Sequence, residues 1–309
     1  KAKAAQAGAF PDPMLSIGLV NVPFKPAKLD ATPMTGLQFT ATQVIPWPTK
    51  LSLASKVARG RVQVTTQRLA EARLRLGALV RATALALAYV DAEARITRQH
   101  GKLLDGLIKV VDVRYRVSKG LLQDLLKAKL ARAKIADRLQ KIARKRDAVE
   151  ARLNALLGRK TTARVARVEL PGPARLKRTV SQLVALAAKH RPLLAKWRKR
   201  IRVERLRRRQ ARTGYLPDFG VSFTYRYRQD SGADPVEGMD FWSVGVAIRI
   251  PLWSISATKA RVRAAEAGIA RERQGLRAAM LEVARDVRTA RDAIRRLAAR
   301  IRIYEKRIL

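Results

Sequence analysis

Two stretches with strict alternation of residue type most constrain how this chain can fold. Over residues 219–227 every second side chain is large and apolar, and those between are glycine, serine, threonine and arginine. The same alternation returns over residues 242–250, after a polar connection rich in aspartate and glycine. A period of two is typical of β-strands, so residues 214–251 are predicted to form a hairpin with one apolar face.

The length of these strands permits two interpretations. Each has about ten residues, which is roughly what a tilted strand needs to cross a lipid bilayer. Aromatic side chains gather near the ends of the apolar face, as where a membrane barrel meets its two interfaces. They are Phe219, Tyr225, Tyr227, Phe241 and Trp242. A water-soluble hairpin packed on a core would show the same alternation, so this pattern alone leaves both interpretations open.

A second hairpin is predicted over residues 11–48. Its segments AFPDPMLSIGLV and QVIPWP resemble YLPDFGVSFTYR and IRIPLW of the later hairpin. Pro11 and Pro217 are 206 positions apart, and Pro46 and Pro251 are 205 apart, so the two hairpins have nearly the same length. This internal duplication disfavours a water-soluble hairpin, because both copies lie between long helical segments in the same way.

The remaining segments are predicted to be long helices joined by short breaks. Residues 49–157 are predicted to form a helical hairpin that turns near 118–120, and its second arm has apolar residues at the alternating spacings of a coiled coil. The other predicted segments are the end of a helix at 1–10, a connector at 158–174 with a short strand at 165–170, an ascending helix at 175–213 broken near Pro192, and a long helix at 252–309. Because the duplication leaves this last helix without a returning partner, we expect the chain to be incomplete at both ends.

The composition excludes several classes of protein. The chain has no cysteine and two histidines, which leaves neither a disulfide framework nor a metal site, and no group of residues indicates a catalytic centre or a cofactor. No apolar stretch is long enough for a membrane-spanning helix. The formal net charge of +42 predicts a polyanionic partner, either nucleic acid or anionic lipid. A basic coiled-coil protein that binds nucleic acid is therefore the main alternative.

The order of the elements resembles the TolC-type outer-membrane efflux protein family. That order is helix, hairpin, long helix, turn and return helix, followed by the same elements again. The stretch RYRVSKGLLQDLLKAKL resembles the tip segment of the family, and GYLPDFGVSFTYRYR and DFWSVGVAIRIPLW resemble its second-repeat strands, particularly in the heavy-metal-efflux branch.

The resemblance implies an α plus transmembrane β fold. Three protomers would each give four strands to a 12-stranded β-barrel in the outer membrane of a Gram-negative bacterium. Long antiparallel coiled-coil helices would continue the barrel as an α-helical tunnel through the periplasm. Four strands cannot close a barrel, and lipid does not tolerate an open sheet edge, so a homotrimer is expected.

The resemblance also implies a function and partners. It implies a passive exit duct for small solutes, metal ions or drugs among them, that works with a periplasmic adaptor protein and an inner-membrane RND-type pump. Neither catalysis, a cofactor nor nucleic acid is expected. A type I secretion duct has the same architecture and remains open. The nucleic-acid-binding alternative explains the charge but not the two amphipathic hairpins.

The turn at 118–120 would be the periplasmic tip on which the adaptor docks. The implied contact residues are Arg114, Tyr115, Val117, Ser118, Gly120, Asp124 and Leu125. Asp124 would also pair with a neighbouring hairpin to keep the tunnel closed; the alternative is a solvated helix-start carboxylate stabilised by the helix dipole. Ser118 stands where the family commonly has glycine, which leaves the turn geometry open.

The charge exceeds that of usual family members, and two sets of residues are candidates to use it. A membrane-proximal basic cluster would bind anionic lipid headgroups just below the barrel: Arg198, Lys199, Arg202, Arg205, Arg208 and Arg209. Arg226, Arg228 and Arg249 would face the lumen and make the duct electropositive. An ordinary solvated basic surface is the alternative in both cases.

Overall fold

The computed structural model describes residues 2–25, 27–170, 172, 176–232, 235 and 237–308. The predicted segment limits at Lys1, Arg175 and Leu309 lie outside these residues. The chain divides into two compact units. One contains Lys1–Leu69 and Thr179–Ala290, and the other contains Ala70–Arg178 and Arg291–Leu309.

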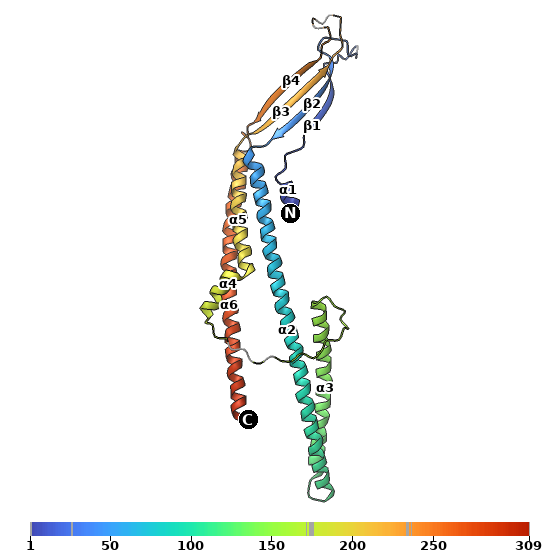
Figure 1. Cartoon of the computed structure of the whole chain (residues 1–309), viewed down its shortest axis with the longest axis vertical. Coiled ribbons are helices and arrows are strands. Elements are labelled where there is room, and N and C mark those ends of the chain that lie inside the picture. The colour runs from blue at the N-terminus through green and yellow to red at the C-terminus, as the bar shows by residue number, and fades with distance from the viewer. Residues whose placement is uncertain are drawn as a thin grey trace. The chain divides into compact units, whose positions relative to one another are not determined.

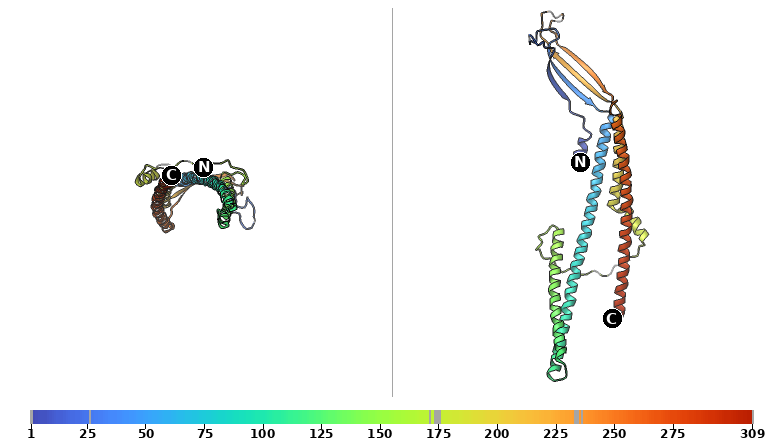
Figure 2. Two further views of the ribbon diagram at one scale, coloured as in Figure 1. Left: turned by 90° about the horizontal axis from the view of Figure 1, so that it is seen from below. Right: turned by 180° about the vertical axis from the view of Figure 1, so that it is seen from behind.

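The first unit contains a four-stranded antiparallel sheet in the order β1-β2-β3-β4 (Figures 1 and 2). The strands are β1 (Met14–Val20), β2 (Gly36–Ile45), β3 (Asp218–Tyr227) and β4 (Phe241–Arg249). Both predicted hairpins are confirmed, because β1 pairs with β2 and β3 pairs with β4. The two copies join through β2 and β3, where Leu37 lies opposite Tyr227 and Ile45 opposite Phe219.

The register separates an apolar face of the sheet from a polar one. Ile17, Phe39, Tyr225 and Trp242 form one row across all four strands on the apolar face. The predicted assignment of Phe241 to this face is wrong. Phe241 lies opposite Arg226, so it belongs to the polar face. The reason is that β4 starts one residue earlier than the alternation indicated, and adjacent residues of a strand point to opposite faces.

The helices of the first unit start and end close to the predicted positions. They are α1 (Ala2–Gln6), the first part of α2 (Pro48–Arg116), α4 (Val180–His190), α5 (Pro192–Arg212), the short 3₁₀ helix η1 (Thr213–Tyr215) and most of α6 (Ile255–Ile308). Pro192 begins α5 because proline lacks the N–H that a continuing helix needs. Residues 176–179 are not helical, contrary to the prediction, since Thr179 and Gln182 form a capping box that starts α4 at Val180.

Glycines on α6 accommodate large side chains of α5. A Cβ atom at Gly268 would lie 2.9 Å from a carboxylate oxygen of Glu204, and one at Gly275 would collide with the ring of Trp197. The two glycines are seven residues apart, as are their partners, so they lie on one face of each helix. Leu194 packs beside them against Ala279 and Val283. Close approach of the two helices therefore depends on missing side chains.

The second unit is built on the helical hairpin. The remainder of α2 packs against α3 (Leu122–Leu156) through Val90, Ala94 and Ile142. The turn between them includes Ser118 at a φ of 58°, and the Lys119 N–H donates to the Arg114 carbonyl. Among the described residues, no helix combines the length and apolar character that crossing a membrane would require.

The strand predicted at 165–170 is wrong, because these residues form no strand and pair with none of the described strands. Side chains of α3 satisfy the connector backbone instead. Glu150 accepts from the Val165 N–H, and Arg146 donates to the Val165 carbonyl. A strand assignment requires backbone partners, and here side chains replace them.

The α5–α6 contact predicts opposite effects of two glycine substitutions. Gly275→Ala is expected to lower the stability of the protein by about 1–3 kcal/mol, because its methyl group overpacks the Trp197 contact. Gly77→Ala is the matched control within α2, where a Cβ meets nothing within 4 Å. It is expected to raise stability by roughly 0.5–1 kcal/mol. Thermal unfolding followed by circular dichroism tests both, and a neutral Gly275→Ala variant would contradict the packing described.

Candidate functional site

The apolar face of the sheet is exposed on β1, β3 and β4 and half-buried on β2, where Ala41 is its exposed residue. On β4, Trp242 is 70% exposed and Val246 is 72% exposed. Ile17 of β1 and Phe223 of β3 are also exposed. A continuous apolar face of this kind marks contact with protein or lipid rather than water. A ten-residue strand is about 34 Å long and, when tilted, matches the roughly 25 Å apolar band of membrane barrels.

The opposite face of the sheet is lined by small and polar side chains. Thr40 and Thr224 hydrogen-bond across β2 and β3 at 3.2 Å, and Arg226 donates to Gln38 at 2.9 Å. Arg249 lies opposite Asp218, whose carboxylate binds Lys50 at 2.7 Å. The structure therefore places two of the three predicted lumen arginines, Arg226 and Arg249, on this polar face.

Arg228 has a different environment from the one predicted. It is 5% exposed, and its guanidinium stacks on Phe241 at 4.0 Å. It donates hydrogen bonds to the carbonyls of Met239 and Pro33. Pro33 belongs to the loop of the first hairpin and Met239 to that of the second. Arg228 therefore ties the two hairpin loops together.

The turn of the helical hairpin presents exposed apolar residues. Tyr115, Val117 and Leu121 are exposed, while Leu125 is 4% exposed and packs inside the hairpin. Asp124 lies in the first turn of α3, where a carboxylate is stabilised by the helix dipole. Of the predicted docking residues, Leu125 thus supports the turn and Gly120 is half-buried in it. The others are exposed: Arg114, Tyr115, Val117, Ser118 and Asp124.

The basic cluster of α5 is divided by its contacts. Lys199 donates to Gln63 at 3.1 Å, and Arg208 lies 3.7 Å from Glu266. Arg198 donates to the Ala188 carbonyl. Arg202, Arg205 and Arg209 are exposed and form no side-chain hydrogen bond or ion pair with any described residue. The predicted cluster thus contains both bound and unneutralised charges.

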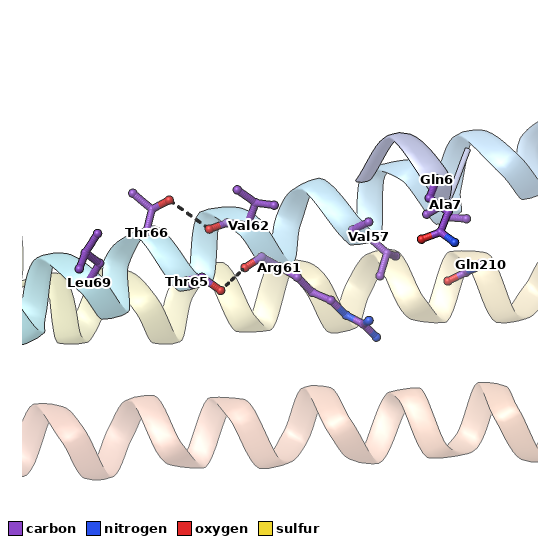
Figure 3. A pocket seen from close by; sticks show the side chains of 11 residues that line it. Gln6, Ala7, Val57, Arg61, Val62, Thr65, Thr66, Leu69 and Gln210 are labelled. Carbon is purple, nitrogen blue, oxygen red and sulfur yellow. Dashed lines mark hydrogen bonds between the residues drawn. The ribbon is translucent and has the colours of Figure 1, made fainter. Parts of the chain in front are cut away.

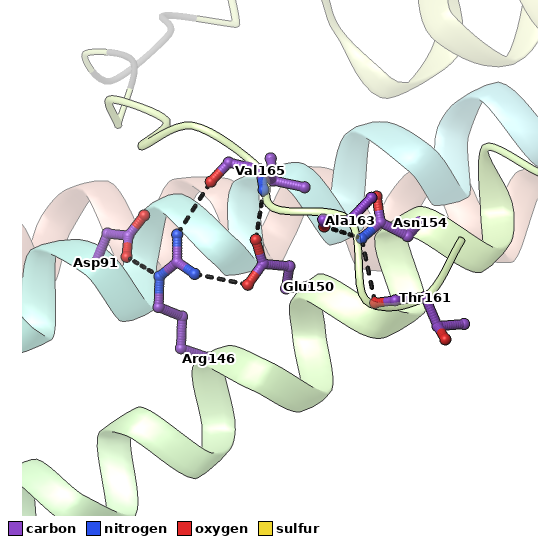
Figure 4. Close-up of polar contacts among 7 residues, drawn as sticks. All are labelled: Asp91, Arg146, Glu150, Asn154, Thr161, Ala163 and Val165. Carbon is purple, nitrogen blue, oxygen red and sulfur yellow. Dashed lines mark hydrogen bonds and ion pairs between the residues drawn. The ribbon is translucent and has the colours of Figure 1, made fainter. Parts of the chain in front are cut away.

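Polar residues of α3 that sequence analysis missed hold the connector in place (Figure 4). Arg146 donates to Asp91 at 2.8 Å and to Glu150 at 2.7 Å. The hydrogen bond with Asp91 raises the pKa of Arg146 above its ordinary value, so its charge is permanent. Asn154, fully buried, donates to Ala163 at 2.5 Å. A groove of about 1010 Å³ runs along the connector.

The contacts of Arg146, Glu150 and Asn154 with the connector form a connector clip, and a signal for it was present in the sequence. Arg146, Glu150 and Asn154 recur every four residues, which places them on one face of α3. Arg146 stands at a seam position of the predicted coiled coil, four residues after Ile142 and three before Val149, where a charged residue needs a partner. That partner, Asp91, lies 55 residues away on α2, and its distance in sequence hid the pairing.

A second groove of about 730 Å³ lies between α1, α2 and α5 (Figure 3). Val57, Val62 and Leu69 line it. The hydroxyls of Thr65 and Thr66 donate to carbonyls of their own helix, Arg61 and Val62, at 3.1 Å each. Because these polar groups are already satisfied, the groove favours packing of another helix over binding of a polar ligand.

Solved structures of outer-membrane channels share this fold. VceC from Vibrio cholerae matches with a TM-score of 0.75 and 20% identity over 98% of this chain and 74% of its own. The outer-membrane channel OprN matches with a TM-score of 0.73 and 15% identity over 99% and 71%. CusC matches with a TM-score of 0.70 and 15% identity over 99% and 73%. No curated protein sequence matches this chain.

The fold is that of an outer-membrane channel protomer, with four strands and long helices. A family model described as "Outer membrane efflux protein" matches residues 183–308, which include α5, the second hairpin and most of α6. This match covers part of the chain, while the shared fold extends over nearly all of it.

The connector clip predicts a local effect of one substitution. Asn154→Ala removes the amide donor that holds the Ala163 carbonyl. The free energy needed to open the connector is therefore expected to fall by about 1–3 kcal/mol. Limited trypsin digestion at Arg164 and Arg167 is expected to accelerate at least fivefold. Asp147→Asn, on an exposed position of the same helix, is the control and should leave the rate unchanged. Equal rates in all three proteins would show that Asn154 does not hold the connector.

Proposed function

We propose that this chain is one subunit of a trimeric exit duct in a tripartite efflux system. The sheet lies in the outer membrane of a Gram-negative bacterium, and the helices extend into the periplasm. The observation that carries this proposal is a single sheet whose apolar face spans all four strands and is exposed on β1, β3 and β4. Contact with lipid acyl chains stabilises an apolar face of this kind.

The edges of the sheet support a trimer. β1 and β4 are the first and last strands of the sheet, and each pairs with one neighbour in this chain. Unpaired backbone groups cost several kcal/mol each in lipid, so both edges need partner strands. Three copies of four strands give a closed barrel of about twelve strands, which is wide enough for an open lumen. Small residues on the polar face, such as Gly220 and Gly245, leave that lumen clear.

The duct works passively in this proposal. Solutes cross the barrel along its polar face, where Arg226 and Arg249 add positive charge. Energy comes from an inner-membrane pump of the RND type, and a periplasmic adaptor protein joins the pump to the duct. The exposed apolar residues at the turn of the helical hairpin, Tyr115 and Val117, support adaptor docking there. Gly120 and Asp124 would complete the contact.

Two other functions make different demands on the same chain. A type I secretion duct uses the same architecture and differs only in the pump and the exported cargo. A nucleic-acid-binding protein would use the net charge of +42, but it has no use for a continuous exposed apolar face. Fractionation separates them, because a duct requires detergent for solubility whereas nucleic acid would be released by salt.

Purified protein is expected to be a trimer in detergent and to form ion channels in planar bilayers. Size-exclusion chromatography with light scattering measures the oligomeric state, and single-channel recording measures conductance. A water-soluble monomer obtained without detergent would overturn the proposal. In the same recordings, anion selectivity is expected in asymmetric salt. Arg226→Gln with Arg249→Gln should lower it several-fold, and Arg226→Lys, which retains the charge, should not.

The tip predicts a separable loss of adaptor binding. Val117→Gln is expected to weaken binding of the cognate adaptor at least tenfold, because it places an amide in an apolar contact. Leu103→Gln is the control, since Leu103 is 73% exposed on the same helix fourteen residues from the turn. Binding is measured by surface plasmon resonance on trimers of normal conductance. Equal effects of both substitutions would exclude the turn as the specific docking site.

A further inference from the structure

Five arginines of α5 lie in one row along the helix. Arg198, Arg202, Arg205, Arg209 and Arg212 are separated by alternating steps of four and three, which places them on one face. Arg198 donates to the Ala188 carbonyl. The other four are exposed, and the described part of the chain provides no ion-pair partner for them. The row therefore concentrates charge that this chain does not neutralise.

Other arginines of α5 are neutralised. Arg207 binds Glu204 at 2.6 Å, and Arg200 reaches Glu272 at 3.5 Å. Both glutamates are buried, at 8% and 7% exposure, and their charges therefore need such partners. The chain thus pairs the arginines at its inter-helix contacts and leaves the row unpaired. Structural pairing does not account for the row.

Basic residues of α6 lie beside the arginine row of α5. The ion pair between Arg208 and Glu266 lies at the edge of the α5–α6 contact. Arg205 and Arg212 are neighbours of Arg208 on α5 by their spacing of three and four. Lys259 and Arg263 precede Glu266 by seven and three residues, so they lie along its side of α6. Both are exposed.

The upper end of this basic surface meets the sheet. α5 ends at Arg212, and β3 begins six residues later at Asp218. α6 begins at Ile255, two residues after Trp253, which is 96% exposed. The two junctions pack together, because a Cβ at Gly214 would lie 2.8 Å from the Thr258 hydroxyl. An exposed tryptophan and free cations therefore occur together at one end of the apolar strands.

We propose that these residues form a lipid-binding collar. This inference rests on the membrane position of the proposed duct. The collar consists of Arg209, Arg212, Lys259, Arg263 and Trp253. It binds the phosphate groups of anionic phospholipids in the periplasmic leaflet of the outer membrane. Arginine and lysine supply charge-assisted hydrogen bonds to phosphate, and tryptophan prefers the level of the headgroups. The collar gives a specific use to part of the unusual charge.

Depth within the membrane selects the upper residues of the row. The headgroup layer on one side of a bilayer is about 5–8 Å thick. Arg212 and Arg209 lie within one to two helical turns of the junction with the sheet. Arg198 lies fourteen residues below Arg212, or about 21 Å along the helix, beyond the headgroups. Arg198 and Arg202 therefore provide a matched control on the same helix face.

The test uses the intact trimer reconstituted in mixed vesicles with spin-labelled phosphatidylglycerol or phosphatidylcholine. Electron spin resonance of the motionally restricted lipid gives the relative association constant of each. The expected result is a several-fold preference for phosphatidylglycerol. Arg209→Gln with Arg212→Gln should abolish most of this preference, and Lys259→Gln with Arg263→Gln should lower it as well. Arg198→Gln with Arg202→Gln should leave it unchanged.

The remaining outcomes overturn the collar in distinguishable ways. Equal association of both lipids with the unchanged protein would exclude the collar while leaving the duct intact. Equal losses in the upper and lower pairs would indicate a diffuse electrostatic effect of the whole row. Competition by inorganic phosphate beyond that of chloride at the same ionic strength would indicate a free-anion site. Absence of any restricted lipid would contradict the proposed function itself, and the collar with it.

Discussion

The structure depends on one constraint on its edge strands. Where water is absent, their unpaired backbone N–H and C=O groups need a partner strand. This chain supplies four strands, with one apolar and one polar face, and leaves the outer edges of β1 and β4 for others to complete. In the proposed duct, apolar side chains at alternate positions set which face meets lipid, while small and polar residues between them set the character of the interior. The long helices, by contrast, satisfy their backbone groups internally and place side chains along their length for packing. Closure of the sheet is thus the step that makes a duct out of a subunit.

Periodicity allowed most of the fold to be predicted. Period two identified all four strands, and both hairpins were located within a few residues. The alternating four and three spacing identified α3, and Pro192 marked the break before α5. The errors have physical causes. The connector was taken for a strand because an extended segment looks alike in sequence whether its backbone is bound by a strand or by side chains. Phe241 was assigned to the wrong face because strand limits are less certain than strand existence.

The candidate site was harder to predict than the fold because its residues act through distant partners. Arg228 reads as a polar residue at the end of an alternating strand, yet contacts with Pro33 and Met239 bury it between two loops. Arg208 and Arg205 look equivalent in sequence, but Glu266 of α6 neutralises only the first among the described contacts. Charge alone did not separate structural arginines from available ones. The helix contacts, set in part by Gly268 and Gly275, make that separation.

The pairing of β2 with β3 has a consequence for how the chain reaches its native state. These strands are neighbours in the sheet, yet Phe39 and Tyr225 are far apart in sequence, with α2, α3, α4, α5 and η1 between them. Closing so large a loop is slow, because its entropy cost precedes the contacts that repay it. Until β3 and β4 form, the first hairpin therefore keeps an exposed apolar face and an open edge, a combination that favours aggregation.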